Sequence, residues 1–157
     1  MEPVVRYGLI AGAISSEVMV LLVLVNTILI RDYFGPQSSA AGWFGIWNIV
    51  YPLLVIIIFE LGGIFSARIG RRNLVAGKDA LITGFITGIT TGIILEVMWF
   101  SQIISLVAHT GTVLPVESGG IGITLLTIAL LLVLVVMGGV LSAFGSYMYA
   151  SRAIPGS

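Results

Sequence analysis

Gly62-Gly-Ile-Phe-Ser-Ala67 and Gly138-Gly-Val-Leu-Ser-Ala143 are two versions of one six-residue sequence. A second pair, Gly8-Leu-Ile-Ala-Gly12 and Gly84-Phe-Ile-Thr-Gly88, has the same offset of 76 residues, and no gap is needed between the pairs. Glycines at this density in apolar sequence favour closely packed helices. We therefore expect two tandem copies of a helical hairpin, arranged in parallel. The two predicted copies are residues 1–76 and residues 77–152.

The composition is that of a membrane protein. Apolar residues make up 58% of the 157 residues and charged residues only 9%, whereas a soluble domain has roughly 25% charged residues. A hydrophobic run of about 18 residues or more predicts a membrane-spanning helix, and the chain has four such runs. The predicted fold is therefore all-α, a single transmembrane domain over residues 1–157 with four spanning helices. The predicted helices cover approximately residues 8–30, 42–66, 80–107 and 121–150.

Charge and residue types exclude several kinds of function. The net charge is zero, with seven basic and seven acidic residues, whereas a nucleic-acid-binding protein needs a basic surface. The chain has no cysteine, so it can form no disulfide and no thiolate-based metal site. The sequence has no nucleophile–base pair, no phosphate-binding glycine loop and no histidine–glutamate metal spacing. We therefore expect no nucleic-acid partner, no cofactor, no metal and no enzymatic activity.

The distribution of basic residues predicts the orientation in the cell membrane. Because cytoplasmic loops carry the excess of Lys and Arg, both termini and the loop at residues 67–79 are predicted to be cytoplasmic. The first apolar stretch, about 23 residues long, exceeds the roughly 7–15 residues of a signal-peptide core. We expect it to remain as the first helix. Arg31 is the only basic residue on the opposite side from Arg6, Arg68, Arg71, Arg72, Lys78 and Arg152.

Four basic residues gather in the predicted cytoplasmic loop: Arg68, Arg71, Arg72 and Lys78. They are expected to contact anionic lipid headgroups, an interaction worth about 1 kcal/mol per basic residue. A specific anionic ligand is the alternative, since the same positive field would attract it. Membrane lipids are therefore expected partners in either case.

Small residues spaced four apart mark the expected contact faces of the helices. In lipid, helices associate through close backbone approach at such residues rather than through the hydrophobic effect. The clearest stripe is Gly84, Gly88 and Gly92, with threonines along its edge. Because all these stripes fall in the predicted cytoplasmic halves, we expect a bundle that is tight there and separates toward the other side. The remaining packing glycines are Gly8, Gly12, Gly62, Gly63, Gly138 and Gly139.

Three acidic residues, Glu17, Glu60 and Glu96, fall inside predicted spans with no Lys or Arg at similar depth. An intramembrane charge costs about 2.5–3.5 kcal/mol on insertion scales and indicates a functional site by default. Glu60 and Glu96 are expected to face the bundle, and Glu17 is compatible with an inward position. The three are candidates for a proton or cation site, or for contacts within the bundle or with a partner subunit. None of them recurs at the 76-residue offset, which disfavours a symmetric pore.

Asn26, Asn48 and Gln102 lie in the predicted outer halves of the helices. Amide side chains in this position can form hydrogen bonds between helices, worth about 0.6–2 kcal/mol each. We expect these residues to link neighbouring helices.

The sequence favours an accessory or scaffold subunit that packs in a larger membrane complex with other subunits or with copies of itself. The alternative is a small proton- or cation-coupled transporter or channel that uses the three glutamates. A third interpretation is a lipid-binding protein that acts through the basic cluster. Minimal loops and unpaired acids favour the first interpretation, and they do not identify the partner.

Overall fold

Four helices make up the described part of the chain. The computed structural model describes residues 2–29, 41–71, 77–110 and 120–153, with only the backbone of residues 41–42, 44, 99–110 and 120–131, and this part contains no strand. The prediction of an all-α chain is therefore confirmed. The helices are α1 (Pro3–Ile28), α2 (Ala41–Gly70), α3 (Gly77–Thr110) and α4 (Gly120–Ala153).

Each helix contains a segment long and apolar enough to cross a membrane. The segments are 22 to 26 residues long with mean hydropathies between 1.7 and 2.3, and a span needs about 20 predominantly apolar residues. Length and composition therefore confirm the prediction of four candidate membrane-spanning helices. The segments are Pro3–Ile28, Gly45–Gly70, Gly77–Met98 and Leu132–Ala153.

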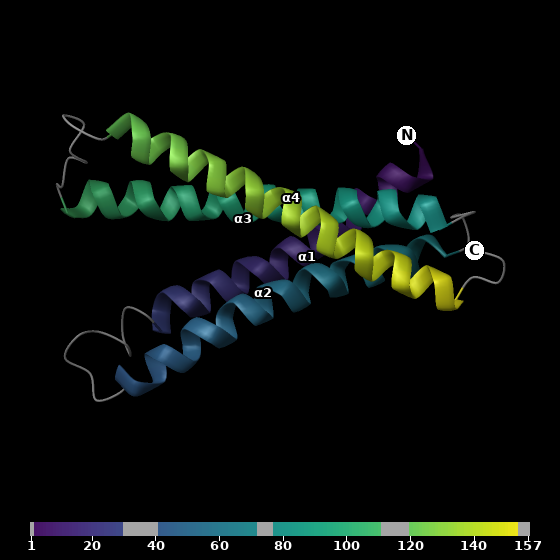
Figure 1. Ribbon diagram of the computed structural model, residues 1–157, viewed down its shortest axis with the longest axis horizontal. Coiled ribbons are helices and arrows are strands. Elements are labelled where there is room, and N and C mark those ends of the chain that lie inside the picture. Colours follow the sequence, from purple (N-terminus) through teal and green to yellow (C-terminus); the bar gives the residue numbers. More distant parts are fainter. Residues whose placement is uncertain (1, 30–40, 72–76, 111–119, 154–157) are drawn as a thin grey trace.

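The helices form two antiparallel hairpins, α1 with α2 and α3 with α4 (Figure 1). The α3–α4 interface is the most extensive, and α3 also packs against both helices of the first hairpin, whereas α1 and α4 hardly meet. The hairpins lie close together at the end that carries both chain termini and diverge toward Ile28 and Thr110 (Figure 1). The glycines and threonines of α3 therefore occupy the central position in the bundle.

Several helix ends differ from the sequence prediction, and α1 begins at Pro3 rather than near residue 8. The loop expected at residues 67–79 is shorter, because α2 continues to Gly70 and α3 already begins at Gly77. Hydropathy reports where apolar sequence ends, but backbone hydrogen bonding continues beyond that point into the charged flanks. Arg68 lies in the last turn of α2 and Asp79 in the first turn of α3. Both charges complement the helix dipole and favour the longer helices.

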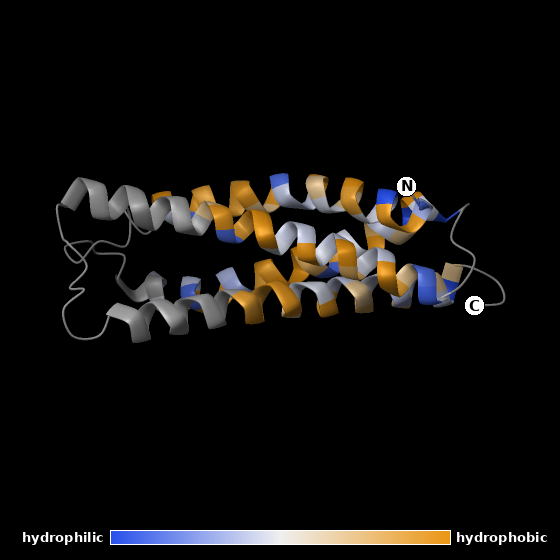
Figure 2. Ribbon diagram, turned by 90° about the horizontal axis from the view of Figure 1, so that it is seen from above, coloured by the Kyte–Doolittle hydropathy of each residue, from blue (hydrophilic) through white to orange (hydrophobic). Residues whose placement is uncertain are grey.

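The interior of the bundle combines small polar side chains with a few apolar ones such as Met19 and Val23, whereas its exterior is apolar. The fully buried side chains include Thr83, Thr87, Ser66 and Ser142. Large apolar side chains are on the outside, such as Leu21, which is 62% exposed. Strongly hydrophobic residues run along the length of the helices, and more neutral residues lie where the helices face one another (Figure 2). This inversion fits a lipid environment, in which small residues let helices approach and apolar side chains face the solvent-like lipid.

Candidate functional site

The backbones of α3 and α4 touch along the glycines of α3. A Cβ atom built on Gly84 would lie 2.5 Å from the carbonyl oxygen of Ser142, and one built on Gly88 would overlap the carbonyl group of Gly138. Real Cβ atoms essentially never approach another heavy atom closer than 3.0 Å. Since the obstructing atoms belong to backbone, no side-chain rotation can make room. Glycine is therefore required at both positions if the two backbones are to touch.

The α3–α4 fit loosens away from this contact. A Cβ on Gly92 would lie 3.1 Å from the Cα atom of Val135, a contact that a small shift could relieve. Toward the end that carries the chain termini, the Ser146 hydroxyl donates a 2.6 Å hydrogen bond to the Ala80 carbonyl. Among the described residues, the interface is therefore tightest around Gly88.

Hydrogen bonds from threonines join α3 to α1. Thr87 Oγ1 lies 3.1 Å from the carbonyl oxygen of Gly8, and Thr91 Oγ1 lies 3.3 Å from that of Gly12. A Cβ on Gly8 or Gly12 would lie 2.8 Å or 2.6 Å from α3 side chains. The single hydroxyl proton of each threonine is shared with the carbonyl four residues before it in α3, at 2.9 Å. The two glycines therefore expose the α1 carbonyls to the threonines of α3.

The adjacent glycines of α2 point to different neighbours. A Cβ on Gly62 would lie 2.6 Å from the Ser15 hydroxyl oxygen of α1 and 3.4 Å from a methyl carbon of Thr87. A Cβ on Gly63 would instead overlap the carbonyl group of Ser142 in α4. This Gly-Gly pair thus lets α2 contact all three other helices at one level.

The second Gly-Gly pair, in α4, has different contacts. A Cβ on Gly138 would overlap the ring of Phe59 in α2, whereas one on Gly139 would lie 2.8 Å from the ring of Phe85 in α3. Both neighbours are aromatic side chains rather than backbone. The two copies of the six-residue sequence therefore make non-equivalent contacts in the bundle.

Glu96 is half-buried on α3, one turn beyond Gly92. One of its carboxyl oxygens, Oε1, is buried and has no hydrogen-bond partner among the described residues. Glu96 is four residues beyond Gly92, where a Cβ atom would meet Val135 of α4. A buried carboxyl oxygen without a partner is a costly arrangement, and it makes Glu96 the most functionally suggestive acid inside the bundle.

Glu60 is half-buried on α2, where the helix crosses α4. The backbone carbonyl of Glu60 lies so close to Gly145 that a Cβ on that glycine would overlap it. The backbone at this acid is therefore packed against α4, while its side chain is only partly covered.

Glu17 is exposed, whereas the sequence is also compatible with an inward position for this residue. Its neighbour Ser16 is buried and donates a 2.6 Å hydrogen bond to the Gly12 carbonyl. Because successive residues are about 100° apart around a helix, burial of Ser16 turns Glu17 toward the outside. Glu17 therefore lies at the surface, on a shallow groove between α1 and α3 lined by Ala13, Ser16, Val20, Leu21 and Ile94.

The three glutamates do not form one site. Ile94 lines the groove beside Glu17, and Glu96 is two residues further along α3, about 200° around its axis. Glu17, which lies beside Ile94, and Glu96 are therefore on opposite sides of α3. In the part of the chain that the structure describes, no three His, Asp or Glu side chains gather closely enough to hold a metal ion.

The basic residues lie at the end of the bundle that carries both termini. Arg68, Arg71 and Lys78 are exposed there, a position from which they can reach lipid headgroups. Arg72, which the sequence places in the same cluster, lies outside the described residues.

Hydrogen bonds between helices involve an amide side chain and threonines, and the sequence analysis identifies only the first kind. The Trp47 indole nitrogen donates a 2.7 Å hydrogen bond to Asn26 Oδ1, so Asn26 does link two helices. Asn48 is exposed, and the side chain of Gln102 lies outside the described residues. The threonine bonds to α1 were not anticipated, although the four-residue spacing of Thr83, Thr87 and Thr91 beside the glycines is a signal that could have indicated them.

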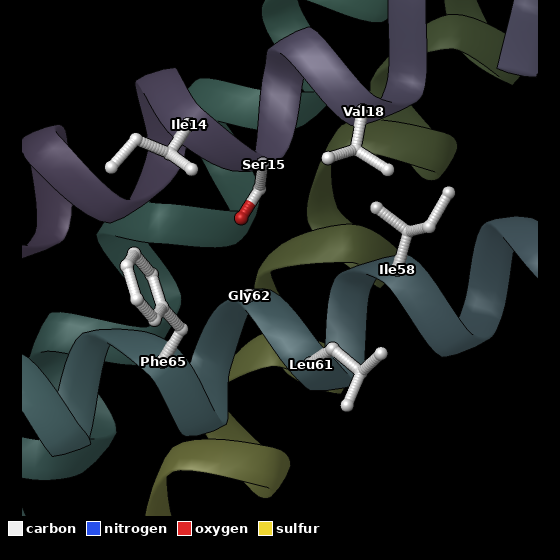
Figure 3. Close-up of a pocket in the computed structure, with 7 residues that line it drawn as sticks. All are labelled: Ile14, Ser15, Val18, Ile58, Leu61, Gly62 and Phe65. Carbon is white, nitrogen blue, oxygen red and sulfur yellow. The ribbon is translucent and has the colours of Figure 1, made fainter. Parts of the chain in front are cut away.

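A groove of about 190 Å³ lies between α1 and α2 (Figure 3). Ser15 points into it toward Gly62, and the other side chains that line it are apolar. None of its lining residues is charged, so its surface is complementary to an acyl chain or an apolar helix. These side chains provide no acid, base or metal ligand for catalysis. The other lining residues are Ile14, Val18, Ile58, Leu61 and Phe65.

Comparison of the chain with protein-family models, with curated proteins and with solved structures finds no match. Functional inference therefore rests on the contacts and charges described above.

Proposed function

We propose that this chain is a non-enzymatic integral membrane protein, an accessory or scaffold subunit that packs in a larger membrane complex. The observation that carries the proposal is Glu17, an exposed carboxyl group midway along α1 on an otherwise apolar surface. A charge held in the hydrocarbon costs about 2.5–3.5 kcal/mol on insertion scales. A neighbouring subunit on this face would shield the carboxyl group and give it a hydrogen-bond partner.

The packing of the interior supports the same proposal. Glycine, serine and threonine fill the centre of the bundle with the backbones of α3 and α4 in contact. The surfaces left for interaction are the outer faces, where the grooves beside Glu17 and Ser15 lie. We also propose that the hairpins are tandem duplicates, that their glycines are the packing residues, and that both termini are cytoplasmic in the cell membrane.

Mass measurement of the protein, extracted from its native membrane in mild detergent, tests this proposal. A complex with unrelated subunits, heavier than multiples of the 16.6 kDa chain can explain, is the expected result. Identification of the associated subunits would name the process that the protein serves. A lone monomer or a homo-oligomer would overturn the accessory role.

A proton- or cation-coupled transporter is the second candidate, and it is favoured by the Glu96 oxygen that has no hydrogen-bond partner among the described residues. Such an oxygen could bind a proton or cation in passage. The test is ion flux into proteoliposomes that contain the wild type or the Glu60→Gln and Glu96→Gln double variant. Transport through these acids predicts that the wild type carries flux and the double variant does not. Equal flux in both, or none in the wild type, would reject this mechanism.

The basic residues contribute to the proposed function as lipid contacts. Arg68, Arg71 and Lys78 are exposed at one end of the bundle, where each would gain about 1 kcal/mol from an anionic leaflet. This contact would hold the subunit at a fixed depth in the membrane.

A further inference from the structure

We infer that the groove beside Glu17 binds one transmembrane helix of another protein, and that this helix presents a single Lys or Arg side chain at the depth of Glu17. The groove is formed by Ala13, Ser16, Glu17, Val20 and Leu21 of α1 with Ile94 of α3. The inference rests on the proposed function and adds the chemistry of the partner.

Depth is the first reason. Glu17 is about 21 Å along α1 from Pro3 and about 16 Å from Ile28, at the helical rise of 1.5 Å per residue. It is therefore too far from either end for its short side chain to reach the headgroup region. A partner group that neutralises it has to be inside the membrane as well.

The shape of the groove favours a helix. Ala13 and Ser16 are small, so they form a depression between the larger Val20, Leu21 and Ile94. Small residues on one helix let the backbone of another approach closely. The Ser16 hydroxyl already donates a hydrogen bond to the Gly12 carbonyl. Among the residues that line the groove, Glu17 alone has an ionisable side chain.

Charge complementarity identifies the partner residue. A carboxylate in a low-dielectric region gains most from an opposite charge in direct contact. Within this chain, every Lys and Arg lies within four residues of a helix end or between the helices. No basic residue of α1 or of its neighbours can therefore reach the depth of Glu17, and the cation has to come from outside.

The same argument disfavours a second copy of this chain on the groove. Two copies related by an axis along the membrane normal would place the same depths opposite each other. Glu17 would then face another Glu17 or apolar side chains, and no cation. A heterologous helix with one basic residue satisfies the carboxyl group, whereas self-association does not.

Binding of synthetic helices to the full-length protein tests the inference. The protein, labelled with a donor fluorophore, is reconstituted in phosphatidylcholine vesicles with acceptor-labelled peptides. One peptide is a polyleucine helix of about 23 residues with a central Lys, and the control peptide lacks the Lys. Energy transfer should show that the Lys peptide binds the wild type about tenfold more tightly than the control peptide, because only the Lys peptide can form a charge pair with Glu17.

Three variants assign the effect to the groove. Glu17→Gln should reduce the preference for the Lys peptide to about onefold, since the charge pair is lost. Glu17→Asp should keep a preference, because it keeps the charge. Met137→Gln, on an exposed position of α4, places an amide on a different lipid-facing surface and should leave the preference unchanged.

Three results would overturn the inference: no preference in the wild type, a preference that survives Glu17→Gln, or energy transfer between labelled copies of the chain that Glu17→Gln abolishes. The last result would make a second copy the occupant of the groove. The proposed function fails separately, if the wild type leaves its native membrane without other subunits. If the protein is found in a native complex but the preference for the Lys peptide does not depend on Glu17, only the inference about the groove is rejected.

Discussion

The α3–α4 and α1–α2 interfaces differ in what separates their backbones. Between α3 and α4, Gly84 and Gly88 leave no room for a Cβ atom because backbone carbonyls of α4 lie against them. Between α1 and α2, Gly62 meets the side chain of Ser15, and an apolar groove opens beside this contact (Figure 3). One hairpin is therefore closed by backbone contact and the other is held partly by side chains.

The number of glycines does not explain this difference, since α1 and α3 both contain them at four-residue spacing. Their direction explains it. Gly8 and Gly12 of α1 face α3, where they accept hydrogen bonds from Thr87 and Thr91, rather than α2. The position of a glycine around its helix thus decides which neighbour packs closely.

The largest expected effect is that of Gly88→Leu, because the new side chain would collide with the backbone of α4. We expect a loss of about 3 kcal/mol in the free energy of unfolding, the upper end for overpacking. Denaturation in mixed detergent micelles, followed by circular dichroism, measures it. Gly45→Leu is the matched control, because a Cβ there meets nothing within 4 Å. Equal losses in the two variants would contradict the backbone contact.

Adjacent glycines of α2 should differ in tolerance. Gly63→Ala would place a methyl group on the Ser142 carbonyl, whereas Gly62→Ala would meet the movable hydroxyl of Ser15. We expect about 2 kcal/mol of destabilisation for Gly63→Ala and less than about 1 kcal/mol for Gly62→Ala. The same unfolding assay compares them, and a larger loss for Gly62→Ala would show that α2 is closer to α1 than to α4.

Replacement of both Thr87 and Thr91 by Val should remove the hydrogen bonds to α1 while keeping side-chain shape. At about 0.6 kcal/mol for each bond between membrane helices, the double variant should lose about 1 kcal/mol. Thr90→Val is the control, since the Thr90 hydroxyl donates a 2.8 Å hydrogen bond to the Ile86 carbonyl of its own helix. If Thr90→Val costs as much as one of the other two changes, the bonds to α1 contribute nothing specific.

The smallest effect is expected for Asn26→Leu, which removes the acceptor of the Trp47 hydrogen bond. About 0.6 kcal/mol should be lost, and the indole fluorescence of the protein should change as the nitrogen loses its partner. Asn48→Leu, at an exposed position of α2, should change neither quantity. A greater loss for Asn48→Leu would mean that the outer end of the first hairpin is held by other contacts.

Hydropathy is sufficient to predict the four helices, because the membrane demands long apolar segments and leaves few alternatives to a helix. Helix ends are less predictable, since Arg68 and Asp79 stabilise turns that lie beyond the apolar sequence. Gly84 and Gly88 lie where the backbones of α3 and α4 approach, but spacing alone does not say which neighbour each glycine meets.

The glutamates illustrate the limit of sequence reasoning about the site. The spacing of Glu96 to Gly92 predicts a position at least partly inside the bundle, and Glu96 is half-buried. Glu17 cannot be placed in this way, since α1 packs against both α2 and α3 and a rotation of 100° separates the buried Ser16 from an exposed neighbour. Only the packed bundle shows that Glu17 faces outward.

Disulfide formation between Gly92→Cys and Val135→Cys tests most directly the central claim that the α3 stripe lies in register against α4. A Cβ on Gly92 would lie 3.6 Å from the Val135 Cβ, within the roughly 3.5–4.5 Å that a disulfide requires. The chain has no native cysteine, so loss of maleimide labelling reports this pair alone. We predict rapid oxidation of the pair in the membrane. Slow oxidation of this pair, with rapid oxidation of Gly92→Cys paired with Gly139→Cys one turn away, would contradict the register and the backbone contact built on it.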